Sequence, residues 1–73
     1  MYIIIGKDKS NFTIASKEYL EEKNLIYSYR DIKNINKSET LWTLKPRSHL
    51  TLPIIYYDNK YIGGYYDLIN HLL

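Results

Sequence analysis

The chain has 73 residues, with ten basic and eight acidic side chains, two histidines and no cysteine. This length predicts a single domain over residues 1–73, and the lack of cysteine excludes disulfides and thiol catalysis. The charges are mixed in sign and no stretch approaches the roughly 20 apolar residues of a membrane span, which argues against nucleic-acid and membrane partners.

Further expectations follow from the residues present and their positions. The two histidines are far apart in the sequence, which argues against a structural zinc site. The N-terminus has neither the basic region nor the long apolar segment of a secretory signal, so we expect an intracellular, cytoplasmic protein. Ile, Lys, Asn and Tyr are abundant and have AT-rich codons, which is compatible with a low-GC cellular genome or a viral genome.

The first part of the chain is predicted to form a strand, a helix and a second strand. Residues 2–5 are an apolar, β-branched run typical of a buried strand. Apolar residues then recur at helical spacing over 11–23, with Ser10 as the expected N-cap and Asn24 as a left-handed closing residue. Residues 26–31 alternate tyrosines with polar side chains, as a strand would.

A short helix is predicted next. Asn36 with Glu39 three residues later is typical of a capping box at a helix start. Trp42 then gives the helix an apolar side and is expected to belong to the core, and Pro46 ends the helix.

A hairpin and a closing helix complete the predicted fold. Residues 51–57 and 61–63 are expected to form antiparallel strands joined by a turn around 58–60. Residues 65–73 carry a leucine and isoleucine stripe typical of a helix. The resulting order, β-α-β-α-β-β-α, predicts an α/β fold with a four-stranded mixed sheet flanked by helices.

Three motifs lie at the ends of these elements: Ser10-Asn11-Phe12-Thr13, Thr51-Leu52-Pro53 and Gly63-Gly64-Tyr65-Tyr66-Asp67. Together they resemble the glutaredoxin family, in which the first motif normally reads Cys-Pro-aromatic-Cys or Cys-x-x-Ser. The resemblance spans nearly the whole chain and implies the minimal thioredoxin-like fold.

Ser10 and Thr13 occupy the family's two cysteine positions. Neither hydroxyl ionises at physiological pH, so neither can replace the thiolate, and iron–sulfur binding of the kind some family members perform lacks its ligand. An oxygen nucleophile at Ser10 would need a base, and His49, on the loop before Pro53, is the histidine whose proximity stays open. No acidic residue is evident that would orient His49 as a base. Helix capping is therefore the favoured role of Ser10, and no catalytic residue is assigned.

The other motifs imply a binding site for glutathione. In the family, the residue before a cis proline offers its backbone to the cysteinyl part of glutathione, and a Gly-Gly-x-x-Asp segment holds the γ-glutamyl end. A lysine three residues before the first cysteine pairs with the glycyl carboxylate. Tyr66 departs from the small or acidic residue common at its position and could crowd the pocket. The residues implied to bind are Lys7, Phe12, Leu52, Pro53, Gly63, Gly64, Tyr65, Tyr66 and Asp67.

Three functions follow as hypotheses. The first is a redox-inactive module that binds glutathione or a segment of a protein partner. The second is a structural or interaction protein, which exposed Tyr56 or Tyr57 on the sheet would favour. The third is a glutathione-dependent oxidoreductase whose cysteines have been replaced, although a mixed Ser and Thr pair is more typical of natural drift.

Overall fold

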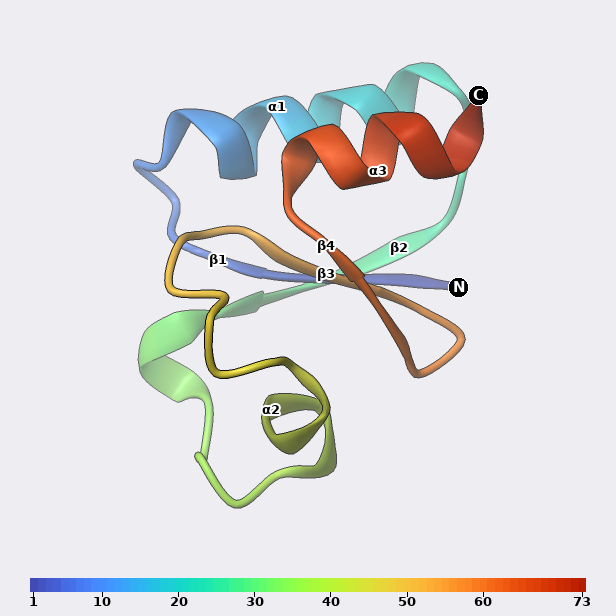
Figure 1. Cartoon of the computed structure of the whole chain (residues 1–73). Helices are drawn as coiled ribbons and strands as arrows, with labels where there is room; N and C mark the ends of the chain where they lie inside the picture. The colour runs from blue at the N-terminus through green and yellow to red at the C-terminus, as the bar shows by residue number, and fades with distance from the viewer.

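A computed structural model describes residues 1–73 and contains a four-stranded sheet with helices on both faces (Figure 1). α1 and α3 lie side by side on one face of the sheet, and α2 lies on the other. The order predicted from sequence is confirmed. The elements are β1 (Tyr2–Gly6), α1 (Asn11–Glu22), β2 (Tyr27–Asp31), a 3₁₀ turn (Ile32–Asn34), α2 (Thr40–Leu44), β3 (Ile54–Tyr57), β4 (Lys60–Gly63) and α3 (Tyr65–Leu72).

The strands lie in the order β2-β1-β3-β4, so the N-terminal strand is central. β1 and β2 are parallel because α1 carries the chain across the sheet between them, whereas β3 is antiparallel to both β1 and β4. Asp58 and Asn59 both have positive φ, 48° and 65°, and form the tight turn of the β3–β4 hairpin. This turn brings β4 directly to the start of α3.

The core has two parts because both faces of the sheet are covered. Tyr2 and Ile4 of β1 pack with buried leucines of α1 and α3, and Ile5 packs on the opposite face, towards α2. This alternation is what a buried strand requires. Trp42 lies against the second part, which confirms its predicted place in the core. None of the helices is long and apolar enough to cross a membrane.

Both ends of α1 form as predicted. The Ser10 hydroxyl accepts a hydrogen bond from the Thr13 N–H at 3.3 Å, which makes Ser10 the N-cap. Asn24 has a φ of 56°, and the following residue, Leu25, donates its N–H back to the Leu20 carbonyl at 3.0 Å. These contacts satisfy backbone groups that the helix ends leave unpaired.

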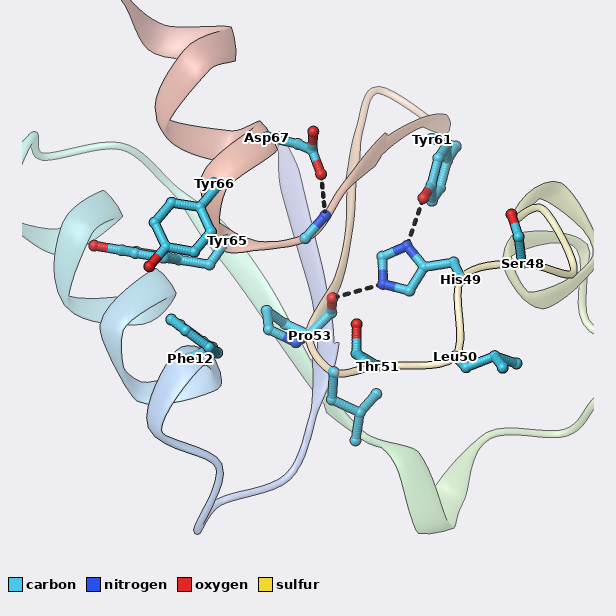
Figure 2. A pocket seen from close by; sticks show the side chains of 12 residues that line it. Phe12, Ser48, His49, Leu50, Thr51, Pro53, Tyr61, Tyr65, Tyr66 and Asp67 are labelled. Carbon is cyan, nitrogen blue, oxygen red and sulfur yellow. Dashed lines mark hydrogen bonds between the residues drawn. The ribbon is translucent and has the colours of Figure 1, made fainter.

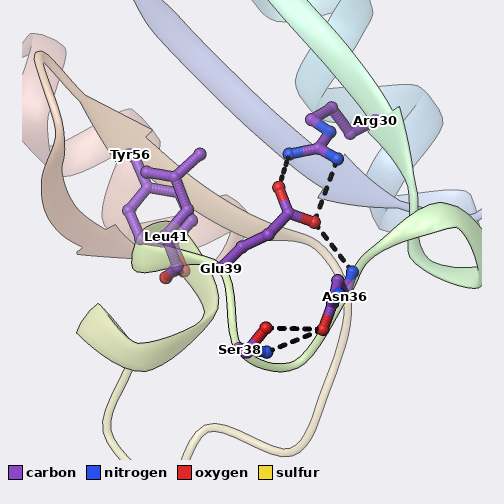
Figure 3. A network of polar contacts seen from close by, with 6 residues as sticks. All are labelled: Arg30, Asn36, Ser38, Glu39, Leu41 and Tyr56. Carbon is purple, nitrogen blue, oxygen red and sulfur yellow. Dashed lines mark hydrogen bonds and ion pairs between the residues drawn. The ribbon is translucent and has the colours of Figure 1, made fainter.

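The predicted helix start at Asn36 is wrong, because α2 begins only at Thr40. Glu39 does accept the Asn36 N–H at 2.7 Å, as a capping box would, but its carboxylate also binds Arg30 of β2 at 2.5 and 3.2 Å (Figure 3). The Asn36 side chain accepts from Ser38 instead of capping the helix. Asn36 and Glu39 therefore belong to a turn that the Arg30–Glu39 contact connects to the sheet.

The strand predicted over 51–57 is also too long. β3 begins at Ile54, which pairs with Ile5, the last residue of β1 that has a partner in β3. Pro53 has no N–H to offer a neighbouring strand. Residues 51–53 therefore lie outside the sheet. Residues 32–34 form the 3₁₀ turn. Other boundaries differ from the prediction by one residue, as helix and strand ends commonly do.

Candidate functional site

A pocket of about 510 Å³ lies where the loop before β3 meets β4 and the beginning of α3 (Figure 2). It gathers residues from the second and third sequence motifs together with one aromatic side chain of α1. The lining residues are Phe12, Ser48, His49, Leu50, Thr51, Leu52, Pro53, Tyr61, Gly64, Tyr65, Tyr66 and Asp67. Seven of the nine residues that the sequence implied for binding line this pocket. Gly63 adjoins it through its neighbour Gly64 in the chain, and Lys7 lies elsewhere.

Tyr66 is one of the lining residues and is 67% exposed. Its ring packs edge-on against Phe12 at 5.5 Å between centroids, and Tyr65 stacks on the same Phe12 ring at 5.6 Å. Figure 2 shows these three rings together on one side of the pocket, with His49 on the other. Tyr66 therefore forms part of an aromatic wall and leaves the backbone at Gly64 uncovered.

The Leu52–Pro53 peptide bond is cis, which confirms the conformation expected from the second motif. Pro53 is buried, and its carbonyl accepts a hydrogen bond from His49. Leu52 lies outside the sheet, and neither its backbone N–H nor its carbonyl forms a hydrogen bond within the chain. A backbone donor and acceptor are therefore available at the edge of the pocket, as the pairing of an added extended segment requires.

The two glycines before α3 differ in their surroundings. Gly63 has a φ of +139°, and a Cβ there would lie 2.3 Å from Asp67 Oδ2, so both the backbone and the packing require glycine. At Gly64 a Cβ would have its nearest neighbours, Pro53 O and His49 Cε1, at 3.8 and 3.9 Å. Internal packing therefore explains why residue 63 is a glycine. At Gly64 the missing side chain leaves open space in the pocket.

Asp67 caps the start of α3 from within the chain. Its Oδ2 accepts the Gly64 N–H at 2.9 Å, and the residue is otherwise exposed. A carboxylate in the first turn of a helix also interacts favourably with the helix dipole. The role implied for Asp67 in holding the γ-glutamyl end of glutathione stays a prediction.

Ser10 and Thr13 are brought together but do not line the pocket. Thr13 is fully buried, and a Cβ on Gly6 would lie only 2.4 Å from its hydroxyl oxygen, so β1 and α1 are in close contact here. The Thr13 hydroxyl also accepts the Lys7 N–H at 3.4 Å. Both hydroxyls thus serve local hydrogen bonds at the start of α1.

His49 is a pocket residue that sequence reasoning considered only as a base for Ser10. Its Nε2 lies 3.1 Å from the Pro53 carbonyl oxygen and its Nδ1 lies 2.5 Å from the Tyr61 hydroxyl, so both ring nitrogens are engaged away from Ser10. The spacing of four residues before Pro53 was the available signal. Its partner on β4 could not be identified from sequence spacing, because the two are 12 residues apart.

Tyr61 completes this polar side of the pocket. Burial, with the nearby Asp67 carboxylate as a second cause, raises the pKa of Tyr61 above its ordinary value. The phenol is therefore protonated at neutral pH and can donate or accept a hydrogen bond.

Lys7 is not brought to this pocket. It lines a smaller pocket of about 290 Å³ with Lys9, Asp31 and Lys33, at the ends of β1 and β2. Its predicted pairing with a ligand carboxylate stays a prediction. The chain also contains no group of three or more His, Cys, Asp or Glu side chains that could hold a metal ion.

Comparison with known proteins gives a consistent set of relatives. No model of a known protein family matches the chain. Glutaredoxin 1 of Rickettsia prowazekii is 33% identical over 60 residues, covering 81% of this chain and 63% of the relative. For glutaredoxin 1 of Rickettsia typhi the identity is also 33%, over 81% of this chain and 58% of the relative. The chain thus spans less than two thirds of the length of these curated relatives.

Solved structures agree with that similarity. Reduced Escherichia coli glutaredoxin superimposes with a TM-score of 0.78 at 27% identity, over 97% of this chain and 91% of the other. Buckwheat glutaredoxin, solved as a complex with glutathione, also gives 0.78, at 14% identity over 97% of this chain and 66% of the other. At 14% identity, the similarity to buckwheat glutaredoxin shows a shared fold and nothing more.

Proposed function

We propose that this chain, which is similar to glutaredoxins but has no cysteine, is a redox-inactive module that binds glutathione or an extended segment of a protein partner. The catalytic thiol of the family is absent, so the proposal rests on binding alone. The observation that carries it is the open pocket between Leu52-Pro53 and Gly64, with the Leu52 backbone unpaired at its edge.

The chemistry of the pocket supports a peptide-like ligand. The free N–H and carbonyl of Leu52 suit the backbone of an extended segment, and the aromatic wall of Phe12, Tyr65 and Tyr66 offers apolar surface beside them. The first N–H groups of α3 have no partner within the helix and favour a negatively charged group. Glutathione combines a peptide backbone with two carboxylates, and the buckwheat relative was solved with it.

The interaction-protein alternative has less support. Tyr56 is fully buried, with its hydroxyl donating to the Leu41 carbonyl, so it offers no surface. Tyr57 is 37% exposed, but its ring packs against Tyr2 at 4.6 Å and His71 at 5.5 Å. Of the two tyrosines, either of which would favour this alternative if exposed, only Tyr57 is exposed, and its ring is already in contact with its neighbours.

An NMR titration tests the binding proposal. Glutathione added to the ¹⁵N-labelled chain is expected to shift the amide signals of Leu52, Gly64 and Asp67 in a saturating way. Gly64→Leu should abolish these shifts, because its side chain would project into the pocket from a backbone position that accepts an L-residue. Asn70→Leu, which adds the same exposed side chain elsewhere on α3, should leave them intact. No shift at millimolar glutathione would contradict the proposal.

A further inference from the structure

The His49–Tyr61 pair has a defined hydrogen-bond direction when the imidazole is neutral. The Pro53 carbonyl can only accept, so the Nε2 that lies 3.1 Å from it carries the ring hydrogen. The Nδ1 is then an acceptor, and the Tyr61 hydroxyl 2.5 Å away donates to it. In this state the hydroxyl hydrogen of Tyr61 points at His49, and its oxygen offers the pocket only lone pairs.

Protonation of His49 reverses that arrangement. Both ring nitrogens of an imidazolium are donors, so Nδ1 donates to the Tyr61 oxygen while Nε2 keeps its bond to Pro53. The hydroxyl hydrogen of Tyr61 is released and can donate into the pocket. The same proton therefore turns this side of the pocket from acceptor to donor and adds a positive charge.

The charges around His49 determine how its protonation alters the net charge of the pocket. Asp67 is the one charged side chain among the lining residues when His49 is neutral, so the pocket then carries a net negative charge. The positive charge of a protonated His49 offsets the negative charge of Asp67. Outside the lining, Lys45 of the same loop donates its Nζ to the His49 carbonyl at 3.2 Å, and the Tyr56 phenol of β3 packs on Tyr61 at 6.2 Å. Burial raises the pKa of Tyr56 to about 12, so this phenol is neutral.

We propose that His49 and Tyr61 are specificity-determining residues that couple ligand choice in this pocket to pH. With His49 protonated the pair donates to a carboxylate of the ligand, and with His49 neutral the pocket disfavours that carboxylate. The inference deepens the proposed function and rests on it, because it assigns a ligand carboxylate to this side of the same pocket. Among the side chains that line the pocket, an imidazole is the one whose charge can change near neutral pH.

The test compares the affinity of the unsubstituted chain for S-methylglutathione at pH 5.5 and pH 7.5. The ligand's carboxyl groups are ionised throughout this range, so the protein supplies the pH dependence. Binding is expected to be about fivefold tighter at pH 5.5, the size of one partly exposed charge interaction. The dimethyl ester of the same ligand, which lacks both carboxylates, should lose this preference.

Three variants assign the effect. His49→Gln can still donate to Pro53 O but cannot titrate, so it should bind equally at both pH values. Tyr61→Phe should reduce the preference because the switching hydroxyl is gone. His71→Gln is the matched control: His71 makes a similar pair with the Tyr2 hydroxyl, 2.8 Å from its Nδ1, but lies outside the pocket, and its loss should leave the preference intact.

The outcomes separate this inference from the proposed function. Equal binding at both pH values in the unsubstituted chain, or a preference that survives in His49→Gln, overturns the inference while the binding proposal stands. If the ligand binds neither at pH 5.5 nor at pH 7.5, both the inference and the binding proposal are overturned. If His49→Gln does not fold, a long-range ¹H–¹⁵N spectrum of the unsubstituted chain decides, because a ring nitrogen pattern unchanged by the bound ligand at pH 6.5 would also overturn the inference.

Discussion

At the scale of single residues, the two glycines before α3 have separate roles. Gly63 adopts a positive φ and lies against the Asp67 carboxylate, so that the Asp67–Gly64 hydrogen bond can close over it. Gly64 has ordinary backbone angles, with a φ of −98°, and an open neighbourhood. The first glycine thus shapes the start of the helix, and the second leaves space for a ligand.

Substitution of each glycine by alanine should separate these roles. Gly63→Ala is expected to lower the free energy of unfolding by roughly 1–3 kcal/mol, because the residue is held at a φ that L side chains avoid and its Cβ would meet Asp67. Gly64→Ala should leave stability nearly unchanged. Urea unfolding of both variants measures the difference, and equal stabilities would show that the close approach of Asp67 is not retained in solution.

The sequence predicted that both glycines are important but not that they have different roles. A Gly-Gly pair indicates close approach of something to the backbone, and the family resemblance suggested a ligand at both positions. The structure places an internal carboxylate against Gly63, and that contact depends on how α3 turns away from β4. Ser10 was easier to predict, because N-capping depends on local geometry within three residues.

At the scale of elements, the loop between β2 and α2 is fixed to the sheet by the Arg30–Glu39 ion pair (Figure 3). The Arg30 guanidinium, with the Asn36 N–H as a second donor, holds the pKa of Glu39 below its ordinary value. The sequence alone suggested the local contact between Asn36 and Glu39. It could not indicate Arg30, nine residues earlier on a strand, which is why the helix start was misplaced.

This ion pair should make stability depend on pH. Since the folded-state pKa of Glu39 lies below the value of 4.5 for a free side chain, its stabilisation is complete above that pH. It is lost as pH falls through the lower, folded-state value. Glu39→Gln should therefore unfold at lower urea than the unsubstituted chain at pH 7, and the gap should narrow at pH 3.

The matched control is Glu22→Gln, which removes an exposed carboxylate that makes no ion pair. It should leave the urea midpoint at pH 7 close to that of the unsubstituted chain. A gap between Glu39→Gln and the unsubstituted chain that stays constant from pH 7 to pH 3 would contradict the assigned role of the ion pair.

At the scale of the whole molecule, the chain has the fold of glutaredoxins and no cysteine. The cis proline, the open Gly64 and the cap by Asp67 surround one pocket, while the Ser10 and Thr13 hydroxyls satisfy backbone groups at the start of α1. Loss of the thiols is compatible with the fold because serine is a good N-cap and threonine fills the space beside Gly6.

The element order and the cis proline could be predicted because local patterns and three spaced motifs agree on them. The position of His49 could not, because its partners Tyr61 and Pro53 are brought to it by the hairpin and the preceding loop. Lys7 lies outside the lining of the main pocket, and its predicted pairing with a ligand carboxylate stays a prediction.

The most direct test of this account installs the missing sulfur. Ser10→Cys with Thr13→Cys places a thiol at the start of α1, where unpaired N–H groups and the helix dipole favour the thiolate. We expect this double variant to reduce disulfides in a glutathione-linked assay, whereas the unsubstituted chain and a Ser10→Ala, Thr13→Cys control show no turnover. A folded double variant without activity would contradict the claim that the binding site is intact, and turnover by the unsubstituted chain would contradict the claim that it is redox-inactive.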